Sequence, residues 1–529
     1  MVATSVLATG MTAYTCETLF STSSIPAAML VGGTAAYFKI GESDINQTCH
    51  SVRRNYPVIG NLRYIMETIR PEIRQYIVES DEDGTPFDRL HRAQIYQRAK
   101  NVNDTIAFGT RRNLYDINAT WACHSMFPKH VPVENARHTI GVKEWGCQKP
   151  YSSSILNISA MSYGAISENA ILGLNNGAKL GNFSHNTGEG GVSQYHRRNE
   201  GDLCWNIGTG YFGCGTGDSH RVFDKTCFQD TLQEANGQVK MIEIKLSQGA
   251  KPGHGGLLPK SKITKEIADA RKLPFPPVAD CHSPSSHSAF HSPYELVDFI
   301  SLLRELSGGL PVGIKMCVGQ PSEVAALCKA FVEMETGPDF ITVDGAEGGT
   351  GAAPPEFSNS IGLPLEEGLV FVRDMLVGAG LKDKVSIIAS GRITNGFSLV
   401  KNLALGADVT NSARGFMMSL GCIQALKCNS NKCPTGIATT NKELMHGLVP
   451  EDKAARVYNY QKLTVQSAVD IIGAMGYTSV DQVSCNDIMR RIHSNEVKTL
   501  REHFPPMEIG SLVDGTAPLR LQSIWNATT

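Results

Sequence analysis

Three cysteines stand close together in the segment GCIQALKCNSNKCPTG, residues 421–436. Cys422, Cys428 and Cys433 have the spacing C-x5-C-x4-C, and Pro434 follows the last of them. Structural zinc sites take four ligands, commonly from paired C-x2–4-C motifs, so this spacing fits zinc poorly. Iron–sulfur clusters bind cysteine thiolates, and a proline follows the last ligand in ferredoxin-like motifs. Three thiols would suit a [3Fe–4S] cluster, which leaves one corner of a cubane without a ligand; three unrelated free cysteines are the alternative.

Glycine-rich segments with polar neighbours form a second group of candidate binding residues. SGRITNG (390–396) and NSARGF (411–416) each follow a short apolar run, and backbone amides at such turns can hold a phosphate. DGAEGGTGAAP (344–354) follows another apolar run, and its four glycines would allow close packing on a flat ring. A phosphate-bearing flavin would use both features. Ordinary turn glycines and a mobile surface loop are the alternatives.

Cationic and amide side chains at predicted strand ends form a third group. Gln248 and Lys251 lie in the glycine-rich segment 247–259, and Arg271 follows twenty residues after Lys251. Such side chains suit a carboxylate substrate. Lys315 ends an otherwise apolar run, PVGIKMCV, and a buried lysine needs a partner. A reduced flavin or a carboxylate could be that partner.

The elements that must position these residues alternate between short apolar runs and longer helical patterns. Helical spacing is clear in 293–307 and 321–335. Strand–helix alternation with polar residues at strand ends is typical of a parallel α/β fold, and about 250 residues suffice for a (β/α)8 TIM barrel. We therefore predict that barrel; a doubly wound open sheet is the alternative. The eight predicted strands lie in the runs 155–164, 182–191, 238–249, 273–281, 310–319, 338–349, 384–392 and 407–415.

Composition bounds the remaining possibilities. The net charge of −2 over 529 residues removes any electrostatic case for nucleic-acid binding. Fourteen cysteines spread through a long chain indicate a reducing, cytoplasmic compartment rather than a disulfide framework. The apolar stretch 25–38 is too short for a membrane span of about twenty residues, so we expect either a buried or loosely ordered segment or weak membrane association.

These patterns divide the chain into four predicted segments. An apolar N-terminal segment covers 1–45, and a helical N-terminal extension covers 46–149, with helical spacing clearest in 62–80. The barrel with its cysteine motif covers 150–445, and a C-terminal helical tail covers 446–529.

Two further motifs are weaker. GTGYFGCGTG (208–217) repeats glycine, but we predict no strand before it and no helix directly after it, so it is not a credible dinucleotide-binding fingerprint. CHSPSSHSAFH (281–291) contains three histidines and a cysteine, which could ligate a metal ion. A polar loop at the barrel mouth is the preferred interpretation.

Together these residues resemble the flavin-binding synthase domain of glutamate synthases, over about 150–445. The resemblance is carried by SAMSYGAIS (159–167), NTGEGG (186–191), QGAKPGHGG (248–256), DGAEGGTGA (344–352) and the cysteine motif followed by TGIAT. It implies a (β/α)8 barrel that holds FMN, with the three cysteines ligating a [3Fe–4S] cluster. HSVRRNYPVIGNLRY (50–64) resembles the shorter, stand-alone members of that family.

The resemblance also implies roles for individual residues. Gln248, Lys251 and Arg271 would bind the carboxylates of 2-oxoglutarate, and Lys315 and Gln248 would be catalytic. The residues implied for FMN, besides Gln248, are Met161, Ser162, Lys315, Gly349, Gly391, Arg392 and Gly415.

Two departures from the large glutamate synthases matter. Those enzymes carry a glutaminase domain with an N-terminal cysteine, whereas Val2 follows Met1 here and about 150 residues precede the barrel. His254 also replaces the glutamate of their KPGEGG motif. We therefore expect reductive amination of 2-oxoglutarate with external ammonia, or with nitrogen from a partner such as a separate glutaminase subunit. The electron donor would be a ferredoxin or a reductase subunit.

Two alternatives keep the cofactors and change the function. An amine in place of ammonia would give an N-alkylated glutamate. A non-catalytic iron–sulfur flavoprotein would transfer electrons without turnover of 2-oxoglutarate.

Overall fold

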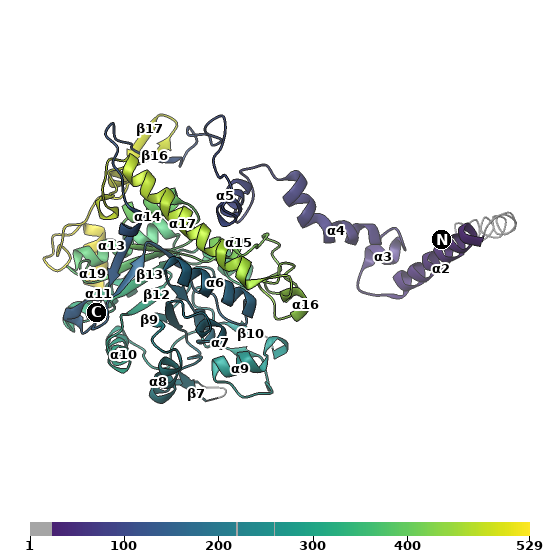
Figure 1. The fold of residues 1–529 in the computed structure, drawn as a ribbon, viewed down its shortest axis with the longest axis horizontal. Coiled ribbons are helices and arrows are strands. Elements are labelled where there is room, and N and C mark those ends of the chain that lie inside the picture. The colour runs from purple at the N-terminus through teal and green to yellow at the C-terminus, as the bar shows by residue number, and fades with distance from the viewer. Residues whose placement is uncertain (1–23, 218–220, 259, 529) are drawn as a thin grey trace. The chain divides into compact units, whose positions relative to one another are not determined.

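The computed structural model describes residues 24–217, 221–258 and 260–528 (Figure 1). It consists of two compact units, residues 1–89 and residues 90–529, which are described separately.

The larger unit is built on a closed barrel of eight parallel strands. Leu156 pairs with Thr410 and Ile158 with His185, so the first strand joins both the last and the second and closes the circle. The prediction of a (β/α)8 barrel is confirmed, and the alternative of an open sheet is wrong. In chain order the strands are β4 (Leu156–Ile158), β5 (His185–Asn186), β6 (Leu203–Ile207), β9 (Val239–Lys245), β12 (Val312–Met316), β13 (Phe340–Asp344), β14 (Ser386–Ser390) and β15 (Val409–Ser412).

Seven of the eight predicted runs contain a barrel strand, and one does not. The run 273–281 forms no barrel strand, because three of its nine residues are prolines, which cannot donate to a strand ladder. The missing strand is β6, whose five residues are all buried. It lies directly before the glycine-rich segment 208–217, so the prediction that no strand precedes that segment is wrong.

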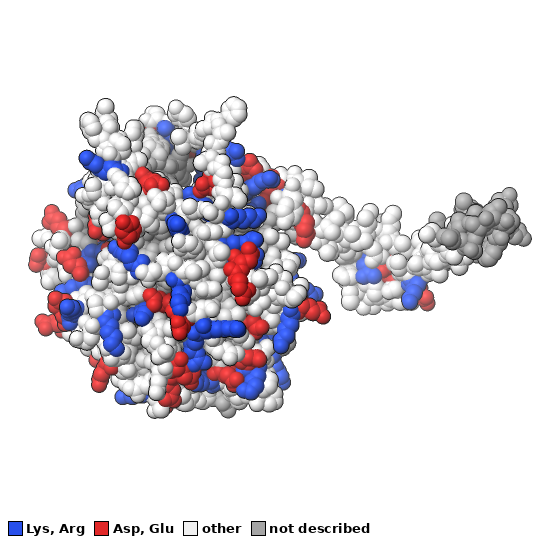
Figure 2. All heavy atoms as spheres, viewed as in Figure 1, with Lys and Arg blue, Asp and Glu red and all other residues white. Residues whose placement is uncertain are grey.

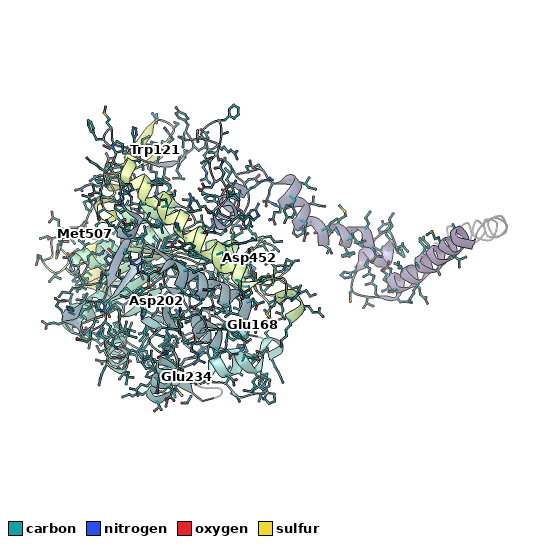
Figure 3. The ribbon with its side chains drawn as sticks, in the orientation of Figure 1. Trp121, Glu168, Asp202, Glu234, Asp452 and Met507 are labelled. Atoms are coloured by element: carbon teal, nitrogen blue, oxygen red, sulfur yellow. The ribbon has the colours of Figure 1, made fainter. Side chains whose placement is uncertain are left out.

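Helices cover the outside of the barrel and alternate with its strands (Figure 1). The predicted helices 293–307 and 321–335 form α10 and α11, and Ser292 caps α10 by accepting a hydrogen bond from the Glu295 amide at 3.2 Å. Glu168 and Asp452, labelled in Figure 3, lie in the first turns of α6 and α17, where a carboxylate stabilises the helix dipole. The main covering helices are α6 (Glu168–Gly181), α8 (Lys225–Glu234), α10 (Pro293–Leu306), α11 (Pro321–Glu333), α13 (Leu365–Gly378), α14 (Gly396–Ala404) and α17 (Pro450–Ala474).

The barrel interior is layered. Its apolar core includes Cys204, Met241, Phe340, Ile388 and Val409, together with residues of the hairpin formed by β2 (Arg137–Ile140) and β3 (Tyr151–Ser154). A polar layer crosses the same interior. The buried Glu243 carboxylate accepts hydrogen bonds from Asn186 Nδ2 at 2.8 Å, Asn206 Nδ2 at 2.6 Å and Thr342 Oγ1 at 2.7 Å.

A strand that precedes the barrel in the sequence pairs with a strand that follows it. β1 (Thr120–Ala122) pairs antiparallel with β16 (Ile488–His493), which pairs with β17 (Glu496–Thr499). The predicted helical tail therefore contains a hairpin between its helices α17 and α19 (Leu519–Ala527), a feature the sequence analysis did not predict.

The smaller unit is helical, as predicted for 62–80. It contains α2 (Ser24–Asn46), α3 (Ser51–Asn55), α4 (Asn61–Ile73) and the π-helical turn η1 (Arg74–Val78). Most described residues of the apolar stretch 25–38 are exposed, so these residues are not buried, whereas a loosely ordered segment and weak membrane association stay predictions. Residues 1–23 of segment 1–45 lie outside the described part. No helix in the described ranges is both long enough and apolar enough to cross a membrane.

Candidate functional site

A polar pocket opens where the loop after β9 meets the loop 281–291. Backbone pairing joins these loops, because β10 (Leu257–Leu258) pairs with β11 (Cys281–His282) and the Ser283 amide donates to the Gly256 carbonyl at 2.9 Å. The residues that line the pocket include Glu189, Thr209, Lys245, Gln248, Lys251, His254, Pro284 and Ser285.

Glu189 is a carboxylate of the pocket on which the neighbouring positive charges act. Lys245 Nζ lies 2.8 Å from Glu189 Oε2 and donates to Gln248 Oε1 at 2.5 Å, so one lysine orients both neighbours. Burial opposes ionisation of Glu189, but the positive charges of Lys245, Lys251 and Arg271 outweigh it and lower the pKa of the carboxyl group. The pocket therefore holds one carboxylate and two lysines, and the charge of Arg271 acts on the same carboxylate.

Lys251 and Arg271, separated by twenty residues of sequence, both act on that carboxylate. Lys251 follows β9, and burial lowers the pKa of its ammonium group although Glu189 opposes the shift. Arg271 is the last residue of α9 (Lys265–Arg271) and is 5% exposed. One of its terminal nitrogens donates to the Tyr163 carbonyl at 3.2 Å, and its Nε has no hydrogen-bond partner in the described structure.

Lys315 and Asp344 form a buried pair at the ends of β12 and β13. Lys315 Nζ lies 3.5 Å from Asp344 Oδ2, and the same oxygen accepts a hydrogen bond from the Gly249 amide at 2.8 Å. Burial alone would lower the pKa of Lys315, but Asp344, Glu243 and Glu189 raise it. Lys315 is therefore a protonated ammonium group, as expected for a buried lysine with a partner.

The residues predicted to contact FMN lie around the same end of the barrel. Met161 and Ser162 follow β4, whereas Gly391 and Arg392 follow β14. Gly349 lies in the loop after β13, against the Arg414 side chain. Gly415 lies in α15 (Arg414–Ser419), where Tyr460 Oη and Ser412 Oγ occupy the space of a Cβ, so packing alone explains this glycine.

Two arginines bracket the loops after β14 and β15. Burial and the charge of Arg392 lower the pKa of Arg414 to about 10, although Asp344 and Glu347 act in the opposite direction. Arg414 donates a hydrogen bond to the Glu347 carbonyl at 2.6 Å. Two neighbouring guanidinium groups at strand ends are suited to a bound phosphate, which would offset their mutual repulsion.

The three motif cysteines lie on one loop after α15. Burial, opposed by a backbone hydrogen bond, raises the pKa of the Cys422 thiol to about 11, and the other two cysteines add to the increase. Burial also acts on Cys433, but the Thr435 hydroxyl and nearby backbone amides outweigh it and lower the pKa of that thiol. The described side chains include no group of three or more His, Cys, Asp or Glu residues in a metal-binding arrangement.

The histidines of 281–291 behave as parts of a polar loop. His287 is buried and contacts Tyr211 Oη at 3.0 Å through Nδ1 and the Lys245 carbonyl at 2.9 Å through Nε2. Thr209 Oγ1 donates to the Pro284 carbonyl at 2.6 Å, which joins the segment after β6 to the same loop. These contacts favour the predicted polar loop at the barrel mouth over a metal site.

Several site residues were missed by the sequence analysis. Glu189 lies in NTGEGG, which was used only for the resemblance, and Arg414 lies in NSARGF, which was considered for its glycine. Lys245 interrupts an apolar strand pattern at its end, as Lys315 does, so the same signal could have found it.

Comparison with known proteins identifies the family. A family model described as the conserved region in glutamate synthase matches residues 95–478. The chain belongs to the glutamate synthase family. It is 36% identical to the glutamate synthase large subunit-like protein YerD of Bacillus subtilis, over 85% of this chain and 91% of that protein.

More distant relatives match over shorter regions. The archaeal-type glutamate synthase [NADPH] of a Thermotoga species is 33% identical to this chain. The match covers 65% of this chain and 64% of that protein. The flavin-binding domain of baker's yeast flavocytochrome b2 superimposes with a TM-score of 0.41 at 11% identity, covering 79% of this chain and 83% of that one. A likeness this weak identifies neither a ligand nor an activity.

Proposed function

We propose that the protein is a glutamate synthase-like flavoprotein that converts 2-oxoglutarate to glutamate with external ammonia or nitrogen supplied by a partner. Ammonia adds to the C2 carbonyl and water leaves, which gives 2-iminoglutarate. Addition of hydride to C2 and of a proton to the nitrogen completes glutamate. The observation that carries this proposal is the cationic pocket at the strand ends in a chain of this family.

The pocket supports a dicarboxylate substrate. A dianion that enters the barrel mouth loses hydration and needs charged donors in exchange. Lys251 lines the pocket with Glu189, and the charge of Arg271 acts on the same carboxylate, so both could neutralise a substrate carboxylate there. Gln248, held by Lys245, offers its amide to the substrate. Lys315 and Gln248 are the proposed catalytic residues, because they lie where β12 and β9 end.

The flavin assignment is supported by the donors at the strand ends. Arg392 and Arg414 would hold the phosphate, and the backbone around Met161, Ser162, Gly349, Gly391 and Gly415 would surround the group. The Lys315 ammonium would face the ring. FMN, bound and reduced, would supply the hydride.

The thiol loop is proposed to hold a [3Fe–4S] cluster through Cys422, Cys428 and Cys433. What supports this proposal is the donor type, because cysteine thiolates are the ligands of such clusters. Electrons would arrive from a ferredoxin or a reductase subunit, and a separate glutaminase subunit could supply nitrogen. The thirteen described cysteines are all free, which is consistent with the reducing cytoplasm proposed for the protein.

An anaerobic reoxidation assay tests the function. The purified protein is loaded with FMN and reduced chemically, and flavin absorbance is followed after addition of 2-oxoglutarate with and without ammonium. We expect reoxidation and glutamate formation only with both. Methylamine in place of ammonium tests the N-alkylglutamate alternative. Flavin and iron that are bound and reducible, without 2-oxoglutarate binding, would instead identify an electron-transfer protein.

A further inference from the structure

The loop that follows β9 is bound to the ends of β12 and β13, the next two strands of the barrel. At its start the Leu246 amide donates a hydrogen bond to the Lys315 carbonyl at 2.9 Å. Further along, Gly249 lies so close to the Gly345 carbonyl that no room is left for a Cβ. Two of the three proposed substrate residues lie in this loop, 246–251, so its attachment decides where they stand.

Asp344, the last residue of β13, adjoins three parts of the site. Its Oδ2 accepts a hydrogen bond from the Gly249 amide at 2.8 Å and lies 3.5 Å from Lys315 Nζ. Gly348, in the glycine-rich loop after β13, stands against the same carboxylate, because a Cβ there would lie 3.5 Å from each of its oxygens. One carboxyl group therefore connects the loop after β9, the buried lysine and the glycine-rich loop.

The pair formed by Lys315 and Asp344 is shielded from solvent. On the visible face of the barrel unit, charged side chains of both signs are intermixed, and water screens them (Figure 2). Lys315 and Asp344 are instead 5% and 6% exposed, so each depends on the other for its charge balance. Burial alone would lower the pKa of Lys315, and Asp344 is the largest of the charges that raise it, ahead of Glu243 and Glu189.

We propose that Asp344 is a positioning residue that acts on the substrate side and the flavin side of the site at once. Its acceptor oxygen holds the loop 246–251, and with it Gln248 and Lys251, in the place where they meet 2-oxoglutarate. Its negative charge keeps Lys315 an ammonium group, and a cation beside a flavin favours the reduced state. This inference rests on the proposed function. The alternative is a purely structural role, in which Asp344 only neutralises a buried lysine.

The charge of Asp344 is tested by Asp344→Asn, which keeps an oxygen for the Gly249 amide. In the full chain loaded with FMN, we expect a spectroelectrochemical titration to give a midpoint potential more negative by about 30 mV, which is a ten-fold loss of preference for the reduced flavin. Asp383→Asn, at an exposed carboxylate before β14, is the matched control and should leave the potential unchanged. An unchanged potential in Asp344→Asn with full flavin content would overturn the proposal.

The acceptor oxygen is tested in chains without the lysine charge, so that no cation is left buried and unpaired. Lys315→Met with Asp344→Asn retains the acceptor, whereas Lys315→Met with Asp344→Ala lacks it. Isothermal titration with 2-oxoglutarate should show about ten-fold weaker binding in the second double variant. Equal affinities, together with lower melting temperatures in both double variants, would overturn the proposal and assign Asp344 a structural role. A wild-type chain that takes up no FMN would refute the proposed function itself, and this inference with it.

Discussion

Replacing Arg271 with leucine tests the substrate pocket most directly. Arg271, at the end of α9, is 5% exposed, and its charge acts on Glu189 together with those of Lys245 and Lys251. Its Nε is buried and has no hydrogen-bond partner among the described residues. A charge-assisted hydrogen bond contributes roughly 1.5–3 kcal/mol. Arg271→Leu should therefore weaken 2-oxoglutarate binding about ten- to a hundred-fold.

Isothermal titration of the flavin-loaded protein with 2-oxoglutarate measures this loss. Flavin absorbance before the titration confirms that the barrel mouth is intact, and a thermal melt reports the cost of leaving the Tyr163 carbonyl without its donor, about 1–3 kcal/mol. The variant should also raise the pKa of Glu189, because one of its three favourable charges is gone.

Lys272→Met is the matched control. It removes a cation from the adjacent position, where Lys272 pairs at 3.2 Å with Glu234 of α8, which is labelled in Figure 3. This variant should bind 2-oxoglutarate normally. Unchanged affinity in Arg271→Leu with full flavin content, or equal losses in both variants, would refute the assignment of Arg271 to the substrate.

Three further predictions concern other parts of the structure. Burial, opposed by a backbone hydrogen bond, lowers the pKa of His287 to about 4. The neutral ring therefore contributes on the order of 3 kcal/mol of folding stability above pH about 6.5, and this contribution is lost as the pH falls toward 4. Urea unfolding across this pH range should show a weaker dependence of stability on pH in His287→Gln than in the wild-type protein. Gly249→Ala should unfold at a markedly lower temperature and lose flavin, because the new Cβ would overlap the carbonyl of the loop after β13, whereas Gly319→Ala, with open space around the new Cβ, should not. Cys428→Ser should lose iron before flavin on anaerobic purification, as measured by metal analysis. Cys123→Ser, which changes an exposed cysteine, should keep both iron and flavin. Iron retained in Cys428→Ser would contradict the cluster assignment.

Much of the barrel could be predicted because its strands are short apolar runs that end in glycine or polar residues. The run 384–392, for example, contains β14 and ends at Arg392, and Asn395 then caps α14. β6 was missed because its sequence, LCWNI, lies between a polar segment and a glycine-rich one and contains an asparagine. That asparagine bonds Glu243 inside the barrel, a contact between strands distant in sequence, which no local pattern reveals.

Some residues of the candidate site could likewise be predicted from the sequence, and others could not. Gln248, Lys251 and Lys315 could be predicted because polar side chains at strand ends stand out against apolar runs. The grouping of Lys251 and Arg271 around Glu189 could not be derived from spacing, because it depends on how α9 returns toward the barrel mouth. In the sequence around Glu189 only the neighbouring glycines indicate a functional site. The role of Glu189 becomes clear only in the folded structure, where the charges of Lys245, Lys251 and Arg271 act on it.

The pairing of β1 with β16 has a consequence for synthesis of the chain. Trp121, labelled in Figure 3, lies opposite Met489, so the strand that precedes the barrel acquires its partner only after the barrel has been translated. At 5–20 residues per second the ribosome needs roughly twenty to seventy seconds to cover that interval. Through this time the β1 edge is open to pairing with other chains, which exposes it to aggregation. In the finished molecule β16 covers this edge.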